Sequence, residues 1–228
     1  MTDASGFPDL DLNTGGCPVC NVASRALFDS FAQLQYALAE DEDTRRRHAA
    51  AGGFCPLHSW QLAALSSSVG LAVTCEALVE HAANALDKTM ASGPTSAIEA
   101  SSEVVRTPAG PHTCAACQAI AQARTHAIQR LAGLLATMEG QTDYARSGGV
   151  CRPDLAKLLS AIPAPDGRRW VLLDAVTRFH QLENDLRTYI DLRESGQRGK
   201  LTRDQLDAPR RALIHLVGAE ELYASRRF

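Results

Sequence analysis

The chain has 228 residues and a formal net charge of -3, with 45% hydrophobic and 21% charged residues. This is the composition of a folded globular protein, and it excludes a disordered chain and, on global charge, a strongly basic nucleic-acid binder. No apolar run approaches the roughly 20 residues that a membrane-spanning helix needs. Aromatic residues make up only 5%, which favours closely packed helices over a β-sandwich.

The beginning of the chain carries information about the cellular compartment. Residues 1–13 are acidic and lack the basic and apolar regions of a signal peptide. We therefore expect a cytoplasmic protein, in which thiols stay reduced and clustered cysteines indicate metal ligands or redox groups. The odd number of cysteines, seven, also argues against complete disulfide pairing.

Apolar residues recur at helical spacing through the first half of the chain. We expect one long helix over about 23–47, ended by Gly52 and Gly53. The charges of residues 41–47 are spaced to form i,i+4 ion pairs on this helix. A short helix follows His58, and a third runs from about residue 71 to about residue 92. The segment 93–112 is rich in Ser, Thr, Pro and Gly, which is typical of a linker.

The second half is predicted to repeat this order and to add helices at its end. The expected elements are a helix over 120–138, a short helix after Asp154, a break at 163–167, a long helix over 170–192, a polar loop over 194–203 and a last helix that begins at Pro209. No segment alternates as a strand does. The predicted fold class is all-α, with helical repeats in residues 1–92 and 113–228 and a C-terminal helical extension.

Six of the seven cysteines fall into a pattern that occurs twice. The two copies are Cys17-Pro-Val-Cys20 with Gly-Gly-Phe-Cys55-Pro-Leu-His58, and Cys114-Ala-Ala-Cys117 with Gly-Gly-Val-Cys151-Arg-Pro-Asp154. The spacers inside the two copies differ in length by one residue. The chain therefore contains an internal duplication of the form C-x2-C…G-G-[FV]-C-x2-[HD].

This spacing is that of a structural metal site. Two cysteines three positions apart can point both sulfur atoms at one ion, and a second pair from a distant turn completes a tetrahedron. Prolines in the next turn, Pro56 and Pro153, place Cys55 and Cys151 at or near helix N-caps. We predict one zinc site from Cys17, Cys20, Cys55 and His58, and a second from Cys114, Cys117, Cys151 and Asp154. Each repeat would then be pinned by its own metal knuckle.

The second predicted site leaves alternatives open. A carboxylate is a harder zinc ligand than imidazole, and Asp154 could leave the fourth position partly open to water. His112, two residues before Cys114, is an alternative fourth ligand. Three cysteines with one further ligand could also hold a [4Fe–4S] cluster at either site.

The pattern CPVC…GGFCPLHSWQL, repeated as CAAC…GGVCRPDLAKL, resembles an uncharacterised family of bacterial proteins of unknown function. Members of that family carry two C-x2-C…G-x-C-x2-H units in an α-helical chain. The segment 40–45 is also similar to the family, and the resemblance covers roughly residues 17–225. It implies a helical protein with two metal sites and brings no established activity. The chain departs from the pattern at Asp154, where the repeat predicts histidine.

Other polar residues give weaker signals. We expect Cys75 to be a buried small residue, and Glu76 and Glu80 to lie on a solvated helix face and not in a metal site with His180. The C-terminal third is locally basic, but no aromatic residues interleave its arginines and nucleic-acid binding is not expected. A catalytic pair of Cys55 and His58 would leave the C-x2-C motifs unexplained, so no catalytic residue is predicted.

Three functions are compatible with these motifs. The first is a zinc-stabilised helical protein that acts as an accessory or interaction module with a protein partner. The second is a redox or sensor protein that holds [4Fe–4S] clusters on the same ligands. The third is a metalloenzyme with an open zinc at Asp154, which we rank last because no general base accompanies it. No membrane association is expected.

Overall fold

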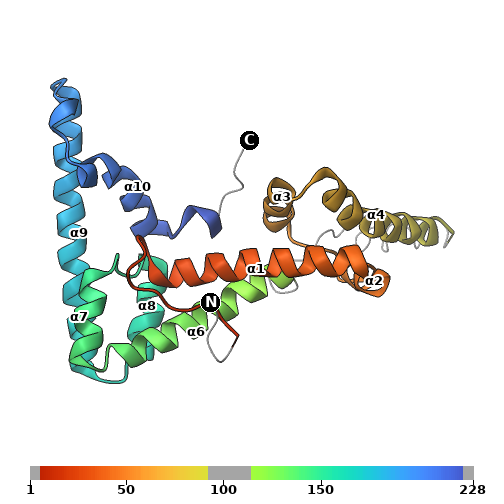
Figure 1. The fold of residues 1–228 in the computed structure, drawn as a ribbon, viewed down its shortest axis with the longest axis horizontal. Coiled ribbons are helices and arrows are strands. Elements are labelled where there is room, and N and C mark those ends of the chain that lie inside the picture. The colour runs from red at the N-terminus through yellow and green to blue at the C-terminus, as the bar shows by residue number, and fades with distance from the viewer. Residues whose placement is uncertain (1–5, 92–113, 223–228) are drawn as a thin grey trace. The chain divides into compact units, whose positions relative to one another are not determined.

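The computed structural model describes residues 6–91 and 114–222, and these residues are helical with no β-strand among them (Figure 1). The α-helices are α1 (Pro18–Glu40), α2 (Glu42–Ala50), α3 (Pro56–Leu65), α4 (Ser68–Ala91), α6 (Ala115–Leu134), α7 (Met138–Arg146), α8 (Arg152–Ala161), α9 (Pro165–Glu194) and α10 (Arg203–Val217). Two short 3-10 helices, η1 (Arg198–Lys200) and η2 (Glu220–Leu222), complete the set. The all-α prediction is confirmed for this part of the chain. The predicted linker, 93–112, and His112 lie outside the described residues.

The chain forms two compact units. The central unit is Leu27–Ala121, and the terminal unit combines the residues up to Ala26 with Gln122–Leu222. Helices α1 and α6 each contribute residues to both units. Both sequence repeats therefore take part in both units, and the boundaries of the predicted repeats, 1–92 and 113–228, stay a prediction.

The central unit is built around a small hydrophobic core. Leu27 and Phe31 of α1 lie in this core together with Phe54 and Leu62, and the thiol-bearing residues Cys55 and Cys114 belong to the same cluster. The rings of Phe31 and Phe54 meet edge to face with their centroids 5.3 Å apart. Helix α2 packs on α4 in the same unit. Apolar packing thus holds Cys55 and Cys114, two of the predicted metal ligands, in place.

The long helix expected over 23–47 is two helices, and that prediction is wrong. Asp41 adopts an extended backbone, with φ of -124° and ψ of 114°, and its carboxylate accepts hydrogen bonds from the backbone N–H groups of Asp43 and Thr44. An aspartate in this position caps a new helix. The charge block also serves α2, because Arg46 pairs with Glu42 and Arg47 pairs with Asp41.

In the terminal unit, α10 packs on α9 and on α8. The prediction that the last helix begins at Pro209 is wrong, because α10 begins at Arg203 and carries Pro209 inside it. Thr202 and Gln205 exchange hydrogen bonds in a capping box that fixes this earlier start. Helix α7 was not expected, and Thr137 caps it by accepting from the N–H of Gly140.

Two surface features complete the fold. None of the helices that the structure describes combines the length and the apolar character needed to cross a membrane. Cys75 is exposed on α4, so the expectation that it is buried is wrong. Glu76, Glu80 and His180 are exposed, as expected for solvated helix faces.

Candidate metal centres

The eight predicted ligands gather into two clusters, but with partners exchanged between the repeats. The His58 cluster consists of Cys55, His58, Cys114 and Cys117, and the Asp154 cluster consists of Cys17, Cys20, Cys151 and Asp154. The ligand atoms of each cluster all lie within 4.8 Å of one another. The predicted grouping, in which each C-x2-C pair joins the C-x2-H or C-x2-D pair of its own repeat, is therefore wrong. The His58 cluster lies within the central unit and the Asp154 cluster within the terminal unit.

Each cluster is built from two helix N-termini. Cys17 and Cys114 directly precede α1 and α6, and the second cysteine of each pair lies in the first turn of its helix. Cys55 and Cys151 are the N-caps of α3 and α8, with nearly equal backbone angles (φ -64° and ψ 161°, against φ -68° and ψ 156°). Unpaired backbone N–H groups at a helix N-terminus stabilise thiolates. The prediction of N-cap cysteines is confirmed.

The glycine pairs before Cys55 and Cys151 make these turns possible. Gly53 and Gly149 have φ values of 71° and 72°, in the left-handed region that favours glycine. A Cβ atom at Gly148 would lie 2.1 Å from the carbonyl oxygen of Gly16, which directly precedes Cys17. The close approach of these two glycines brings the segment before α8 to the segment before α1, and thereby Cys151 to Cys17.

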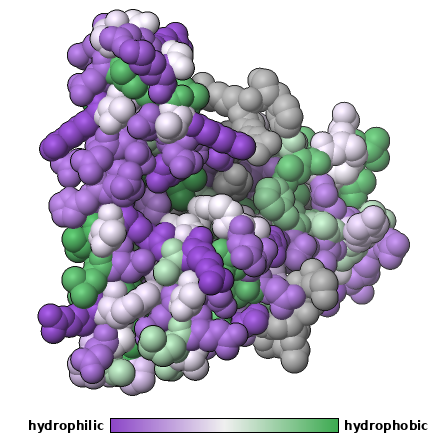
Figure 2. All heavy atoms as spheres, turned by 60° about the vertical axis from the view of Figure 1, so that its left-hand side comes forward, coloured by the Kyte–Doolittle hydropathy of each residue, from purple (hydrophilic) through white to green (hydrophobic). Residues whose placement is uncertain are grey.

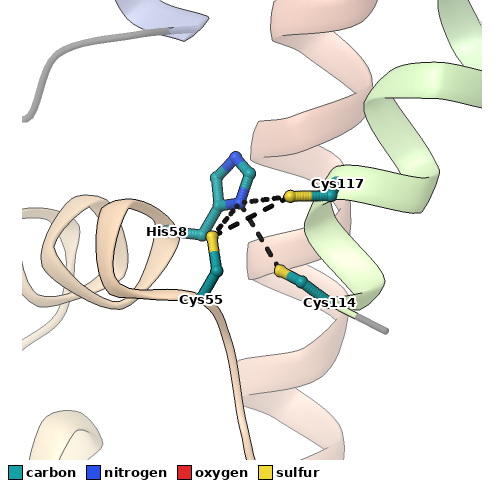
Figure 3. A group of neighbouring side chains, drawn as sticks. All are labelled: Cys55, His58, Cys114 and Cys117. Atoms are coloured by element: carbon teal, nitrogen blue, oxygen red, sulfur yellow. Dashed lines mark hydrogen bonds between the residues drawn. The ribbon is translucent and has the colours of Figure 1, made fainter. Parts of the chain in front are cut away.

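In the His58 cluster, three sulfur atoms surround one imidazole nitrogen (Figure 3). The Nδ1 atom of His58 lies 3.1 Å from the sulfur of Cys55, 3.5 Å from that of Cys114 and 3.3 Å from that of Cys117. The sulfur atoms of Cys55 and Cys117 are 3.8 Å apart. Zinc–sulfur bonds of about 2.3 Å at tetrahedral angles place two sulfur atoms about 3.8 Å apart, so the cluster has the dimensions of a single four-coordinate ion.

Burial sets the protonation of this cluster. It lowers the pKa of His58, which keeps the imidazole in the neutral form that binds metals. Burial, together with the charge of Cys114, raises the pKa of Cys117 to about 12. The ring of Phe31 meets the imidazole edge to face with centroids 6.3 Å apart. Thiols held in such an apolar setting ionise readily only when a cation compensates their charge.

The Asp154 cluster has similar dimensions and deeper burial. The sulfur of Cys151 lies 3.6 Å from the sulfur of Cys20 and 3.5 Å from Oδ2 of Asp154. The sulfur of Cys20 lies 3.8 Å from the same carboxylate oxygen. All four ligands have exposed fractions of 1% or less. Hydrogen bonds from Cys151 and Cys17 lower the pKa of Cys20, which favours a thiolate in this cluster.

Two cations accompany the carboxylate of Asp154. The guanidinium Nε of Arg124 lies 3.9 Å from Oδ2, and the ammonium group of Lys157 lies 3.8 Å from Oδ1. Burial nevertheless raises the pKa of Asp154, against the opposing charge of Arg124. The Oδ1 atom is buried and has no hydrogen-bond partner among the described residues. A buried carboxylate with an oxygen that accepts no hydrogen bond is suited to bind a metal cation. Arg124 and Lys157 offset the negative charge that the carboxylate adds to the cluster.

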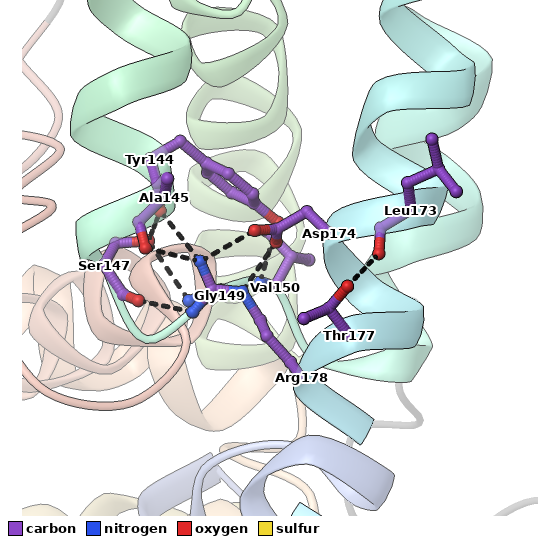
Figure 4. Close-up of polar contacts among 9 residues, drawn as sticks. All are labelled: Tyr144, Ala145, Ser147, Gly149, Val150, Leu173, Asp174, Thr177 and Arg178. Carbon is purple, nitrogen blue, oxygen red and sulfur yellow. Dashed lines mark hydrogen bonds and ion pairs between the residues drawn. The ribbon is translucent and has the colours of Figure 1, made fainter. Parts of the chain in front are cut away.

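Arg178 of α9 holds the segment that leads to Cys151, as Figure 4 shows. Its guanidinium donates to the backbone carbonyls of Tyr144, Ala145 and Ser147, and it is paired with Asp174 at 2.6 Å. Tyr144 is 1% exposed, and its hydroxyl accepts a hydrogen bond from the N–H of Val150 at 3.2 Å. Neither Arg178 nor Tyr144 was singled out from the sequence, because an arginine in an amphipathic helix carries no signal that distinguishes it from a surface charge.

The comparisons with known proteins agree with the sequence resemblance. The profile of a family described as "Family of unknown function (DUF6062)" matches residues 9–218, so the chain belongs to this family. The predicted membership in a helical family of unknown function is thereby confirmed. No curated protein matches the chain. No solved structure matches it either.

Proposed function

We propose that this member of the DUF6062 family is a metal-stabilised helical protein that holds one zinc ion in each cluster and acts as an accessory or interaction protein in the cytoplasm. The observation that carries the proposal is the convergence of four ligand atoms within 4.8 Å in each of two buried clusters. Each ion would tie two helix N-termini together. The binding free energy of such ions is folding free energy, so they would stabilise both compact units.

The cluster dimensions favour a single ion over an iron–sulfur cluster. The ligands of a [4Fe–4S] cluster bind different iron atoms, so the whole cluster has to fit between them. Sulfur–sulfur separations of 3.6 and 3.8 Å leave room for one ion only. Ligands of three cysteines with either histidine or aspartate fall within the range that zinc accepts.

The burial of the ligands supports a structural role over a catalytic one. A catalytic zinc keeps one position open for water or substrate. All four ligands of the Asp154 cluster are almost fully buried, and the carboxylate of Asp154 is 0% exposed. Such a site would be closed by its fourth ligand. The same argument applies to the His58 cluster, in which only Cys117 is partly exposed.

A protein partner is favoured by apolar side chains on the surface. Helix α4 exposes Val69, Val79 and Met90, and α10 exposes Leu213 and Val217. Large apolar side chains that face solvent could be covered by another protein, which is why a protein partner forms part of the proposal.

Metal analysis combined with an absorption spectrum tests the proposal. Protein purified without oxygen is expected to contain about two zinc ions per chain and to show no visible absorption, because zinc has a filled d shell. Iron with acid-labile sulfide and a brown colour would overturn the zinc assignment in favour of a redox protein. A protein that contains no metal after purification, and takes up none when zinc is added to the reduced thiols, would overturn the proposal as a whole.

A further inference from the structure

The two clusters differ in how far their cysteines are shielded from solvent. Of the six cluster cysteines, all of which lie in the described part of the chain, five are buried and Cys117 is partly exposed. Cys55 and Cys114 of the same cluster are 8% and 0% exposed. Oxidants act on cysteines that are both ionised and accessible. An oxidant in solution therefore meets the His58 cluster at Cys117.

The Asp154 cluster offers no such access. Each of its four residues is at most 1% exposed, so the cluster contributes almost nothing to the surface of the protein. Figure 2 shows the side of the terminal unit that carries α9, where hydrophilic side chains predominate. Thiolates that lie beneath such a surface stay inert unless the unit opens.

A second sulfur atom lies within reach of Cys117. The sulfur of Cys55 is 3.8 Å away, and the two residues come from different elements, Cys55 from the turn before α3 and Cys117 from α6 (Figure 3). A disulfide has a sulfur–sulfur bond of about 2 Å, so a shift of roughly 2 Å would join the two atoms. Both residues belong to the central unit, so the bond requires no change between the units.

The remaining ligands would not retain the ion. A disulfide between Cys55 and Cys117 leaves only His58 and Cys114, whereas a structural zinc ion takes four ligands. Metal-binding histidines usually donate their second ring N–H to an acceptor, which strengthens the bond to the metal. The Nε2 atom of His58 is buried and has no hydrogen-bond partner among the described residues. Loss of two thiolates would therefore release the zinc.

We propose that Cys117 is a site of oxidation by peroxides, that it forms a disulfide with Cys55, and that the His58 cluster thereby releases its zinc while the Asp154 cluster keeps its own. This inference rests on the zinc sites of the proposed function. It adds a peroxide-sensitive step to one of the two sites, and it makes the metal content of the central unit dependent on the oxidant level.

The chemistry needs one peroxide molecule for each disulfide. The thiolate of Cys117 attacks a peroxide oxygen, the O–O bond breaks, and a sulfenic acid forms while the departing hydroxide takes a proton to become water. The thiolate of Cys55 then attacks this sulfur, the S–O bond breaks, and a second hydroxide leaves and takes a proton. Two electrons pass from the two sulfur atoms to the peroxide.

Hydrogen peroxide added to the zinc-loaded full chain, with a zinc-binding dye as the readout, tests this proposal. The Cys75→Ser background removes the exposed cysteine outside the clusters. We expect one zinc ion per chain to be released at least about tenfold faster than the other. Peptide mapping should show a disulfide between Cys55 and Cys117, and a thiol reductant should restore zinc uptake. Equal release of both ions would overturn the proposal, and a disulfide between Cys114 and Cys117 would overturn Cys55 as the partner.

Two variants locate the sensitive site. Cys151→Ser removes a ligand of the Asp154 cluster, so the zinc that remains should be released as fast as the first ion of the background protein. Cys117→His keeps four ligands but places no thiolate at the accessible position, so it should slow the first release about tenfold. Slow release from Cys151→Ser would overturn the proposal even if Cys117→His failed to bind zinc.

The zinc content before peroxide is added separates this inference from the proposed function. A chain that holds no zinc at that stage would overturn both. About two bound ions, neither of which responds to peroxide, would leave the structural zinc sites in place and overturn the peroxide-sensitive step alone.

Discussion

The two clusters have the same arrangement of three cysteines and a fourth residue, but the charges around the fourth residue differ. In the central unit, His58 completes three cysteines beside the aromatic rings of the core, and its neutral imidazole adds no charge. In the terminal unit, Asp154 completes three cysteines, and its negative charge is met by Arg124 and Lys157. The comparison teaches that the fourth ligand and its surroundings change together, while the cysteine framework and the helix N-termini stay the same.

The carboxylate is therefore not a defect of the second repeat. With a divalent ion, three thiolates and an imidazole carry a net charge of -1, whereas three thiolates and a carboxylate carry -2. The extra charge would be costly in a buried site without nearby cations. The basic partners of Asp154 supply this compensation, so we expect both clusters to bind metal and to differ in how firmly they hold it.

Removing the metal should produce the largest effect and should separate the two clusters. We expect a strong chelator to release zinc in two phases and to cause loss of helical circular dichroism, because structural zinc contributes on the order of 10 kcal/mol to folding. The harder carboxylate ligand should make the Asp154 cluster release its ion first. The assignment can be checked with Cys151→Ser, which should keep only the slower phase. Two indistinguishable phases would mean that the fourth ligand does not set the affinity.

Double substitutions test the exchange of ligands between the repeats. In the structure, Cys17 and Cys151 share a cluster, whereas Cys17 and Cys55 do not. Cys17→Ser with Cys151→Ser should therefore lower the zinc content from about two ions to about one. Cys17→Ser with Cys55→Ser should lose both ions and most of the fold. The opposite ranking, measured by metal analysis of both proteins, would restore the pairing within each repeat.

Exchanging the fourth ligands sharpens the comparison further. Asp154→His should retain the metal, because imidazole is a good zinc ligand, and Asp154→Ala should lose it from that cluster. His58→Asp should bind zinc at least tenfold more weakly than the unchanged protein, because it places a charge beside Phe31 in the apolar core. Competition with a zinc-binding dye gives both affinities. Equal tolerance of the two exchanges would show that the surroundings do not distinguish the ligands.

The smallest effects are expected at the residues that support Cys151. Arg178→Met should lower the free energy of unfolding by about 2–3 kcal/mol, because it leaves backbone carbonyls and Asp174 without a charged donor. Tyr144→Phe should cost about 1–2 kcal/mol, because the buried N–H of Val150 loses its acceptor. Denaturant unfolding measures both. Tyr36→Phe, at an exposed tyrosine, is the matched control and should change nothing.

The eight residues of the two clusters could be identified from the sequence, because cysteine pairs at fixed spacing leave few other interpretations. The sequence could not show how these residues group, because each C-x2-C pair has suitable spacing to join the C-x2-H pair or the C-x2-D pair. The distances within the two clusters show which combination the fold selects, and the approach of Gly148 to Gly16 accounts for it in the Asp154 cluster. Arg124 and Lys157 were missed for a related reason, because their positions relative to Asp154 depend on tertiary packing.

The expected helices correspond to α1, α3, α4, α6, α8, α9 and α10, where apolar spacing is regular, whereas α2 and α7 were not expected as separate helices and several helix ends were placed wrongly. The start of α10 was readable in principle, because Thr202 followed three residues later by Gln205 is the signature of a capping box. Pro209 lies inside α10, six residues after its first residue, so this proline does not mark the helix start. Asp41 was interpreted as part of an ion-paired face, although the same side chain is a strong N-cap and divides α1 from α2.

The exchange of ligands between the repeats also fixes the order in which the sites can be assembled during synthesis. Cys114 lies 56 residues after His58, whereas Cys151 lies 131 residues after Cys20. All residues of the His58 cluster have been synthesised once residue 117 has left the ribosome, whereas the Asp154 cluster is complete only after residue 154. At translation rates of about 5–20 residues per second, the first C-x2-C pair stays without its partners for several seconds longer. During that interval its two thiols are the part of the nascent chain that depends most on a reducing environment.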